Sequence, residues 1–356
     1  MQFTSKKMTS KERLAALFQN QPVDKVPMLG SWFMWAHIAK LNGMTITDIY
    51  EFPKESIEAH RLANELYDLD GGTVYMMTDF GSWEFGGKAI FPGGDQEAMV
   101  VTERAAATAE KALALQCPTD ILAAGGVGKY FEAGKIQQQM GDLVTFDLGT
   151  PFLFASNIIG VDHIMMMMIE NPEAVHHVLA ESTKFYLALL EIWVKEFGAA
   201  NLFPMMAASS ESNKLISSAF HKEFSIPYLK TVLDKMIELK VDKLLLHICS
   251  EQNPNLPNYQ ELTYPINTIF SVGPEMDMVK LAEIFPQHII AGNIDPLKLL
   301  QGKPQDIYAE CCEIIKTMAK TDTRFILMPG CDVPPNAPPV NVYQMVKATQ
   351  DMAGKC

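Results

Sequence analysis

The sequence of 356 residues contains only four arginines, at positions 13, 61, 104 and 324. Lysine and arginine together number 29 against 42 aspartates and glutamates, which gives a formal net charge of −13. This balance argues against nucleic acid and anionic membrane surfaces as partners. So few arginines also argue against a site that clamps several carboxylates or phosphates, because the guanidinium fork is the usual group for that task.

The chain also lacks a long apolar run and a disulfide framework. No run of about 18 apolar residues occurs, so we expect no membrane span. The six cysteines include an adjacent pair, Cys311 and Cys312, and an isolated Cys117. The first seven residues are too short and polar for a targeting segment. We therefore expect a cytoplasmic protein, in which a cysteine is packed, reactive or metal-bound.

What is present is a core-forming composition, with 48% hydrophobic and 20% charged residues. Eight short β-rich runs follow one another: 26–31, 73–77, 143–148, 201–206, 243–249, 268–272, 288–293 and 324–329. From the fourth run onward they alternate with helical patterns at 219–239, 277–285, 296–300, 304–320 and 338–352. Such alternation indicates a parallel sheet buried on both faces. The pattern predicts an α/β protein, a single (β/α)8 TIM-type barrel domain over residues 1–356.

Two additions to the barrel are predicted. The segment from Thr9 to Phe18 reads as a helix capped by Ser10, and it opens an N-terminal helical extension. Residues 81–94 are rich in glycine and aromatic side chains, so we expect a hairpin or lid insertion at the barrel mouth.

The most informative motif lies at the end of the fifth run, where His247 and Cys249 are separated by one residue. On a strand, residues i and i+2 point to the same face. Cys331 follows the eighth run after a Pro-Gly pair, and the strand ends of a barrel converge at its mouth. One nitrogen and two sulfur ligands with one open position form the pattern of a catalytic zinc site. The alternative is that both cysteines are buried structural thiols and His247 is a packed core histidine.

Three polar residues near the predicted mouth are further candidates. Glu211, after the fourth run, is either a fourth metal ligand, a proton acceptor or a solvated loop acid. Asp332 either supports the metal ligands or is a turn residue. Asn253 either caps the next helix or faces the substrate.

Several stretches resemble the uroporphyrinogen decarboxylase superfamily, and within it the methylcobamide:coenzyme M methyltransferase branch. The His247-x-Cys249 pair and the late Pro-Gly-Cys331-Asp-Val-Pro-Pro-Asn-Ala-Pro carry the likeness to this branch. The opening 11–17 and 22–27, the segment Ala291-Gly-Asn293-Ile-Asp-Pro and the stretch 340–346 are similar to the superfamily as a whole. The likeness covers nearly the whole chain.

The resemblance implies a zinc-dependent, corrinoid-linked methyltransferase. His247, Cys249 and Cys331 would hold Zn²⁺, which deprotonates a bound thiol. The thiolate would attack the methyl group of a methylcobamide (corrinoid) carried by a partner protein. Substrate contacts are expected from an aromatic approach and two amides: Trp32, Trp35, Asn253 and Asn293.

Two departures limit the resemblance. The decarboxylases carry an arginine-rich stretch after the first strand, whereas residues 30–37 contain no arginine, so decarboxylation is not expected. After the fourth strand the methyltransferases tend to show Asp-Pro, whereas this chain reads Ala207-Ala-Ser-Ser-Glu211. Two other functions therefore stay open: transfer from a methyl donor, such as a methoxylated aromatic or methylamine-type compound, to the corrinoid, or a superfamily relative that is not a methyltransferase.

Overall fold

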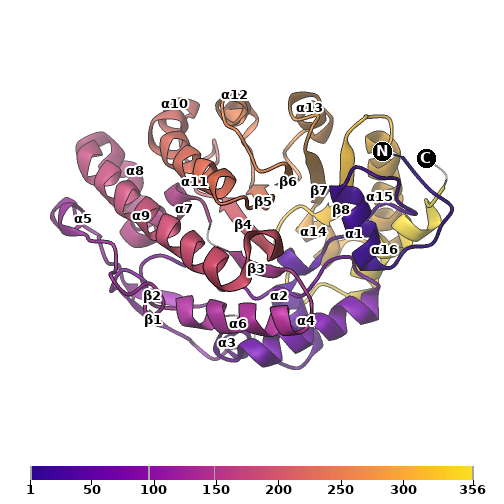
Figure 1. Cartoon of the computed structure of the whole chain (residues 1–356), viewed down its shortest axis with the longest axis horizontal. Coiled ribbons are helices and arrows are strands. Elements are labelled where there is room, and N and C mark those ends of the chain that lie inside the picture. Colours follow the sequence, from indigo (N-terminus) through magenta and orange to yellow (C-terminus); the bar gives the residue numbers. More distant parts are fainter. Residues whose placement is uncertain (1, 95–96, 148, 355–356) are drawn as a thin grey trace.

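A parallel sheet of six strands forms the centre of the computed structural model, which describes residues 2–94, 97–147 and 149–354. Its strands follow sequence order, and helices surround it (Figure 1). They are β3 (Val144–Asp147), β4 (Leu202–Ala208), β5 (Lys243–Ile248), β6 (Asn267–Val272), β7 (Ile289–Ile294) and β8 (Arg324–Pro329). The third predicted run becomes β3, although its last residue, Leu148, lies outside the described residues. Nearly every residue of these strands is buried, as expected for a parallel sheet covered on both faces.

The helices confirm the predicted alternation in the second half of the chain. An almost continuous helical segment follows β4, and single helices or pairs follow β6, β7 and β8. The bounds are α5 (Ala109–Ala114), α6 (Val127–Gln139), α7 (Pro151–Ile159), α8 (Val161–Glu170), α9 (Pro172–Phe197), α10 (Ser218–Phe220), η3 (His221–Ser225), α11 (Ile226–Glu238), α12 (Leu256–Gln260), α13 (Met278–Ile284), α14 (Pro296–Gln301), α15 (Pro304–Met318) and α16 (Pro339–Asp351).

The first two predicted strands are wrong as strands. The run 26–31 lies beside β8 but forms only an isolated bridge, between Met28 and Leu327, and its last residue, Ser31, begins a 3₁₀ turn. In the run 73–77, side chains bind the backbone where a neighbouring strand would do so. The Thr73 backbone N–H donates a hydrogen bond to the Asp142 carboxylate at 3.2 Å, and the Met77 backbone N–H donates one to the Tyr130 hydroxyl at 2.8 Å. Because backbone groups must be paired wherever they are buried, these side-chain partners allow the run to leave the sheet ladder.

The predicted N-terminal helical extension is present as α1 (Ser10–Phe18), α2 (Trp35–Leu41), α3 (Ile46–Glu51) and α4 (Pro53–Tyr67). The cap of α1 is Thr9 rather than the predicted Ser10, since Thr9 and Glu12 form a reciprocal capping box. Ser10 instead accepts a hydrogen bond from the Gly71 backbone at 3.0 Å. The predicted insertion contains β1 (Lys88–Ile90), which forms an antiparallel pair with β2 (Val100–Glu103), beyond the predicted end at residue 94.

Within the described ranges, no single helix has the length and apolar character needed to cross a membrane; α7 and α8 meet that test only as a pair bent by 100°.

Candidate metal centre

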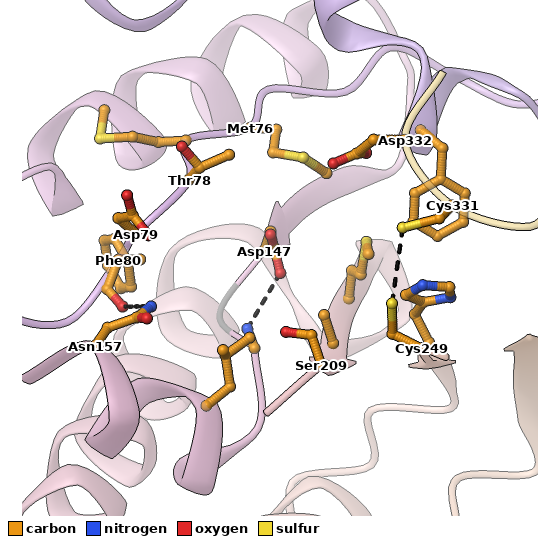
Figure 2. A pocket seen from close by; sticks show the side chains of 17 residues that line it. Met76, Thr78, Asp79, Phe80, Asp147, Asn157, Ser209, Cys249, Cys331 and Asp332 are labelled. Atoms are coloured by element: carbon orange, nitrogen blue, oxygen red, sulfur yellow. Dashed lines mark hydrogen bonds between the residues drawn. The ribbon is translucent and has the colours of Figure 1, made fainter. Parts of the chain in front are cut away.

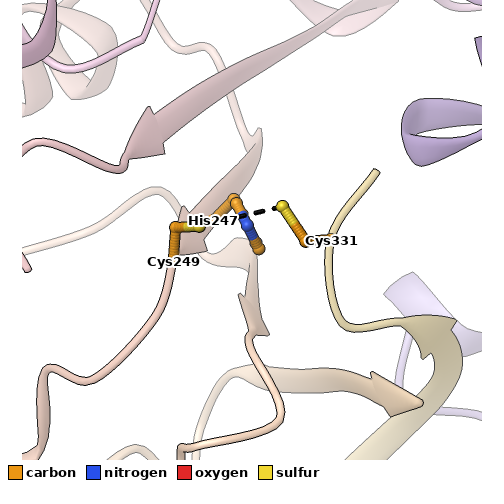
Figure 3. A group of neighbouring side chains, drawn as sticks. All are labelled: His247, Cys249 and Cys331. Carbon is orange, nitrogen blue, oxygen red and sulfur yellow. Dashed lines mark hydrogen bonds between the residues drawn. The ribbon is translucent and has the colours of Figure 1, made fainter. Parts of the chain in front are cut away.

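His247, Cys249 and Cys331 come together at the carboxyl ends of the strands, although they are far apart in the sequence (Figure 3). Their ligand atoms all lie within 4.8 Å of one another, and the two Sγ atoms are 3.7 Å apart. His247 is on β5, Cys249 directly follows β5, and Cys331 follows β8 after one glycine. Among the residues that the structure describes, no other group of His, Cys, Asp or Glu has ligand atoms this close together.

The local backbone explains why the two loops meet. Alternation along β5 sends His247 and Cys249 to one face, while the buried Leu244 and Leu246 occupy the other. After β8 the chain passes closely over the neighbouring loop at Gly330. A Cβ at this position would lie 2.9 Å from the Cδ of Pro274, so a residue without a side chain is needed there.

The His247 ring is held on one side and free on the other. Its Nδ1 lies 3.2 Å from the hydroxyl of Ser271, which stands in register with it on β6. Its Nε2 is buried without a hydrogen-bond partner. An unpaired buried ring nitrogen is costly in a folded protein. A histidine that binds a metal through one nitrogen and hydrogen-bonds through the other has this arrangement.

The two thiols influence each other's ionisation. The contact with Cys331 lowers the pKa of Cys249, and the same contact raises the pKa of Cys331. The physical cause is that one ionised sulfur accepts the proton of the other, whereas two negative charges this close repel. A cation shared by both sulfurs would remove that repulsion.

The geometry fits zinc. With Zn–S bonds of about 2.3 Å, two sulfurs of a tetrahedral site lie about 3.8 Å apart, and the observed separation is 3.7 Å. Two cysteine sulfurs and one imidazole are soft and borderline ligands that suit this ion. Three protein ligands leave a fourth position for a substrate atom.

The three side chains border a cavity of about 220 Å³ (Figure 2). It lies at the carboxyl ends of β3, β4 and β5 and is closed on one side by residues 76–80. The remaining lining combines apolar, aromatic and acidic side chains. These residues are Phe33, Met76, Met77, Thr78, Asp79, Phe80, Asp147, Gly149, Leu153, Asn157, Met205, Ala207, Ser209 and Asp332.

Two of the acids on this wall have environments that resist ionisation. Asp332 accepts a hydrogen bond from Trp35 Nε1 at 3.2 Å, and desolvation raises the pKa of its carboxyl to about 6. Desolvation also raises the pKa of Asp79. Although protein surrounds both carboxyls, both side chains face the cavity and are accessible there.

Glu211 does not join the cluster. Its carboxyl is completely buried, does not line the cavity, and accepts hydrogen bonds from the hydroxyls of Thr150 and Ser225. Burial raises its pKa to about 7. The expectation of a fourth ligand at this position is therefore corrected: the loop after β4 turns this side chain toward Thr150, the N-cap of α7, and Ser225, the last residue of η3.

Three expected substrate contacts also lie away from the cavity. Trp32 packs edge-on against Phe203 in the core, with ring centres 5.7 Å apart. In the 3₁₀ turn η1 (Ser31–Phe33), successive side chains point in different directions, so Phe33 lines the cavity in place of Trp32. The amides of Asn253 and Asn293 donate to the backbone carbonyls of neighbouring loops. Trp35 reaches the cavity wall only through Asp332.

The acids Asp79 and Asp147 were missed by the sequence analysis. A signal for both was present, because Asp147 is the next-to-last residue of the third predicted strand and Asp79 follows the second by two residues. Barrel enzymes place functional residues at such strand ends. Phe33 and Ser209 gave no comparable signal.

Comparisons with known proteins agree with this architecture. The model of the uroporphyrinogen decarboxylase (URO-D) family matches residues 9–352. A relative named methylcobamide:CoM methyltransferase MtbA, from Methanosarcina acetivorans, is 26% identical over 96% of this chain and 98% of its own length. The relative of the same name from Methanosarcina mazei is 29% identical over 39% of each chain. These relatives confirm the predicted resemblance to that branch.

Solved structures support the fold. A methyltransferase from Methanosarcina mazei has a TM-score of 0.80 at 24% identity and covers 97% of this chain and 99% of its own. This likeness confirms the predicted barrel fold. A B12-independent methionine synthase from Shewanella sp. W3-18-1 has a TM-score of 0.53 at 12% identity, over 87% of this chain and 89% of its own. On the family match over nearly its full length, the chain belongs to the uroporphyrinogen decarboxylase family.

Proposed function

We propose that the chain is a zinc-dependent, corrinoid-linked methyltransferase that moves a methyl group between a methylcobamide and a thiol. The single observation that carries the proposal is the cluster of His247, Cys249 and Cys331, with its 3.7 Å sulfur separation and its unpaired imidazole nitrogen. Two relatives named methylcobamide:CoM methyltransferase support the same class of reaction. The methylcobamide would be a substrate carried by a separate corrinoid protein.

Each residue of the cluster has a defined task in this proposal. Ser271 holds the His247 ring through Nδ1, which would leave Nε2 available to the ion, and both cysteines would bind it through sulfur. Zinc bound by these residues would hold the sulfur of a substrate thiol as a thiolate at neutral pH. The apolar lining, which includes Met76, Phe80 and Met205, limits water around the reacting sulfur and methyl carbon.

The reaction balances without a further reagent. The thiol proton leaves to solvent, and the sulfur lone pair forms the new S–C bond with the methyl carbon. The cobalt–carbon bond breaks with its electron pair retained by cobalt, which changes from Co(III) to Co(I). No external oxidant or reductant is required.

The composition of the cavity weighs against decarboxylation of a porphyrinogen. Among the lining residues within the described part of the chain, none is lysine or arginine. A site for a substrate with several carboxylates would need such groups. The three acids on the wall would instead repel it.

Metal analysis and a transfer assay test the proposal. We expect about one zinc per chain, and we expect the zinc-loaded protein to convert free methylcobalamin and a thiol to cob(I)alamin and a thioether. The change in the visible spectrum of the corrinoid reports the rate, and mass spectrometry identifies the thioether. Zinc binding without methyl transfer in either direction would contradict the methyltransferase, and a protein that binds no zinc would contradict the metal site.

A further inference from the structure

The wall of the cavity is acidic close to the sulfur cluster. Asp79, Asp147 and Asp332 line it together with the three candidate ligands, whereas no lysine or arginine among the described residues does so. In Figure 2, Asp332 lies next to Cys331, Asp79 lies on the opposite side of the cavity, and Asp147 lies between them. A molecule bound at the sulfurs would therefore have carboxylates around its other end.

Within the described part of the chain, neither Asp79 nor Asp332 forms an ion pair with a lysine or arginine. The partner of Asp332 is the indole N–H of Trp35, a neutral donor. Arg104 acts on Asp79 through its charge, but its Nη1 donates to the carbonyl of Asn157 at 2.6 Å and the residue does not line the cavity. The backbone of Gly149 donates to Asp147 at 3.1 Å.

An independent feature marks the cavity as a ligand site rather than an acidic hollow. His247 is only 2% exposed, and its unpaired Nε2 belongs to a ring that borders the same cavity. The paired sulfurs of Cys249 and Cys331 border it as well. Acidic groups and candidate ligands therefore line the same cavity.

We infer that the small molecule entering this cavity carries a positive charge, such as an ammonium group, and that anionic thiols are disfavoured. This inference rests on the proposed function and specifies its substrate class. The inference contrasts with the name of the two relatives, which refers to CoM, a thiol that carries a negative charge. Coulomb interactions at short range in a partly dry site are worth a tenfold change or more in affinity.

The size and the aromatic lining are compatible with a compact cation. A cavity of about 220 Å³ holds a molecule of a few non-hydrogen atoms beside the sulfurs. The rings of Phe33 and Phe80 belong to the lining, and aromatic faces attract ammonium groups.

Two kinds of substrate share this chemistry. An aminothiol would accept the methyl group at sulfur, as in the balanced reaction above. A methylated ammonium compound would donate it instead: the C–N bond breaks with its pair retained by nitrogen, and Co(I) supplies the pair for the new cobalt–carbon bond.

The first test uses the full-length, zinc-loaded protein with free methylcobalamin and three thiols of similar size. These are cysteamine (cationic), 2-mercaptoethanol (neutral) and 2-mercaptoethanesulfonate (anionic). We expect kcat/KM to fall in that order, by at least about tenfold between the extremes. A second arm offers tetramethylammonium with cob(I)alamin, and formation of methylcobalamin there would identify the cation as a donor.

The second test measures binding without turnover. Calorimetry compares 2-(methylthio)ethylamine with 2-(methylthio)ethanesulfonate, two thioethers that differ in charge and have no thiol to ionise. We expect the amine to bind at least about tenfold more tightly. If no substrate reacts in either arm, the proposed function fails while calorimetry still decides the inference; if the sulfonates react and bind as well as the amines, the inference is overturned and the function stands.

Two aspartate-to-asparagine variants test whether the preference for the amine thioether depends on the acidic wall of the cavity. Asp79 has a φ of +56°, a backbone conformation that asparagine tolerates, so Asp79→Asn removes the charge without backbone strain. We expect it to reduce the preference for the amine thioether several-fold. The control, Asp234→Asn, makes the same chemical change at an exposed ion pair on α11 and should leave the preference unchanged. Equal preferences in both variants would contradict the role of the acidic wall.

Discussion

Two buried polar clusters follow the ends of neighbouring strands, and they differ in what they face. At the end of β5, His247 and Cys249 border the cavity with Cys331. After β4, Glu211 is sealed among Thr150, Ser225 and the surrounding core. Each cluster contains a buried atom without a hydrogen-bond partner, His247 Nε2 in one and Glu211 Oε2 in the other.

The difference shows why an unpaired buried atom must be interpreted with its surroundings. His247 Nε2 can be satisfied by a ligand, because its ring borders an open volume next to two sulfurs. Glu211 Oε2 does not border that cavity, and burial raises the pKa of the carboxyl to about 7, which favours its protonated form. We therefore assign ligand chemistry to the first cluster and a structural role to the second.

The largest expected effect comes from removing a sulfur of the open cluster. Cys249→Ala or Cys331→Ala leaves two protein ligands, and we expect loss of zinc and a decrease in methyl transfer of more than about 100-fold. The control is Cys117→Ala, which removes a half-buried thiol outside the cluster. Metal analysis and the methylcobalamin assay measure both effects. A variant that keeps its zinc would contradict the role of that cysteine.

A smaller effect is expected from the hydroxyl that orients the imidazole. Ser271→Ala removes the partner of His247 Nδ1, and we expect zinc affinity to fall about 10- to 100-fold. Ser56→Ala is a matched control, because it deletes a buried hydroxyl that has no hydrogen-bond partner. Competition with a metal chelator measures the affinity. Equal affinities in the two variants would show that Ser271 does not support the ligand.

The smallest effect on activity is expected at the sealed cluster. Glu211→Gln should keep methyl transfer within about twofold of the wild type, because the carboxyl does not reach the cavity. The amide oxygen can still accept from Thr150 and Ser225. A loss of activity comparable to that of Cys249→Ala, with folding intact, would remove the distinction between the two clusters.

The same variant should change the pH dependence of stability. The folded pKa of Glu211, about 7, lies above its ordinary value of 4.5, so its favourable contribution is present at low pH and is lost as the pH rises through 7. Between pH 5 and pH 8 the wild type loses this contribution and Glu211→Gln does not. The unfolding free energy of the variant, relative to that of the wild type, should therefore rise by about 2.5 kcal/mol over this range. Glu84 has a similarly raised pKa of about 7 but is present in both proteins, so it cancels. Urea unfolding measures the free energies of both proteins at pH 5 and pH 8. The same difference between variant and wild type at the two pH values would contradict this prediction.

The sequence predicts the second half of the molecule better than the first. Apolar runs from 143 onward lie in strands, and each pairs with a neighbouring strand of the sheet. The run 73–77 has similar composition, but Asp142 and Tyr130 bind its backbone, and such distant side-chain partners leave no trace in local periodicity.

The same distinction holds within the cavity. The i and i+2 spacing of His247 and Cys249 is a local geometric property of a strand, so their common face could be predicted from the sequence. That Phe33 lines the cavity instead of Trp32 depends on a short 3₁₀ turn. That Glu211 is buried away from the cavity depends on how the loop after β4 packs. Both are consequences of tertiary packing rather than of local pattern.

X-ray absorption at the zinc edge tests the central claim most directly. For the zinc-loaded protein we expect two sulfur scatterers at about 2.3 Å and one imidazole nitrogen at about 2.0 Å, and a third sulfur after addition of cysteamine. A shell made only of nitrogen and oxygen, or a sulfur count that a bound thiol leaves unchanged, would contradict the claim that His247, Cys249 and Cys331 hold zinc with one position open to substrate.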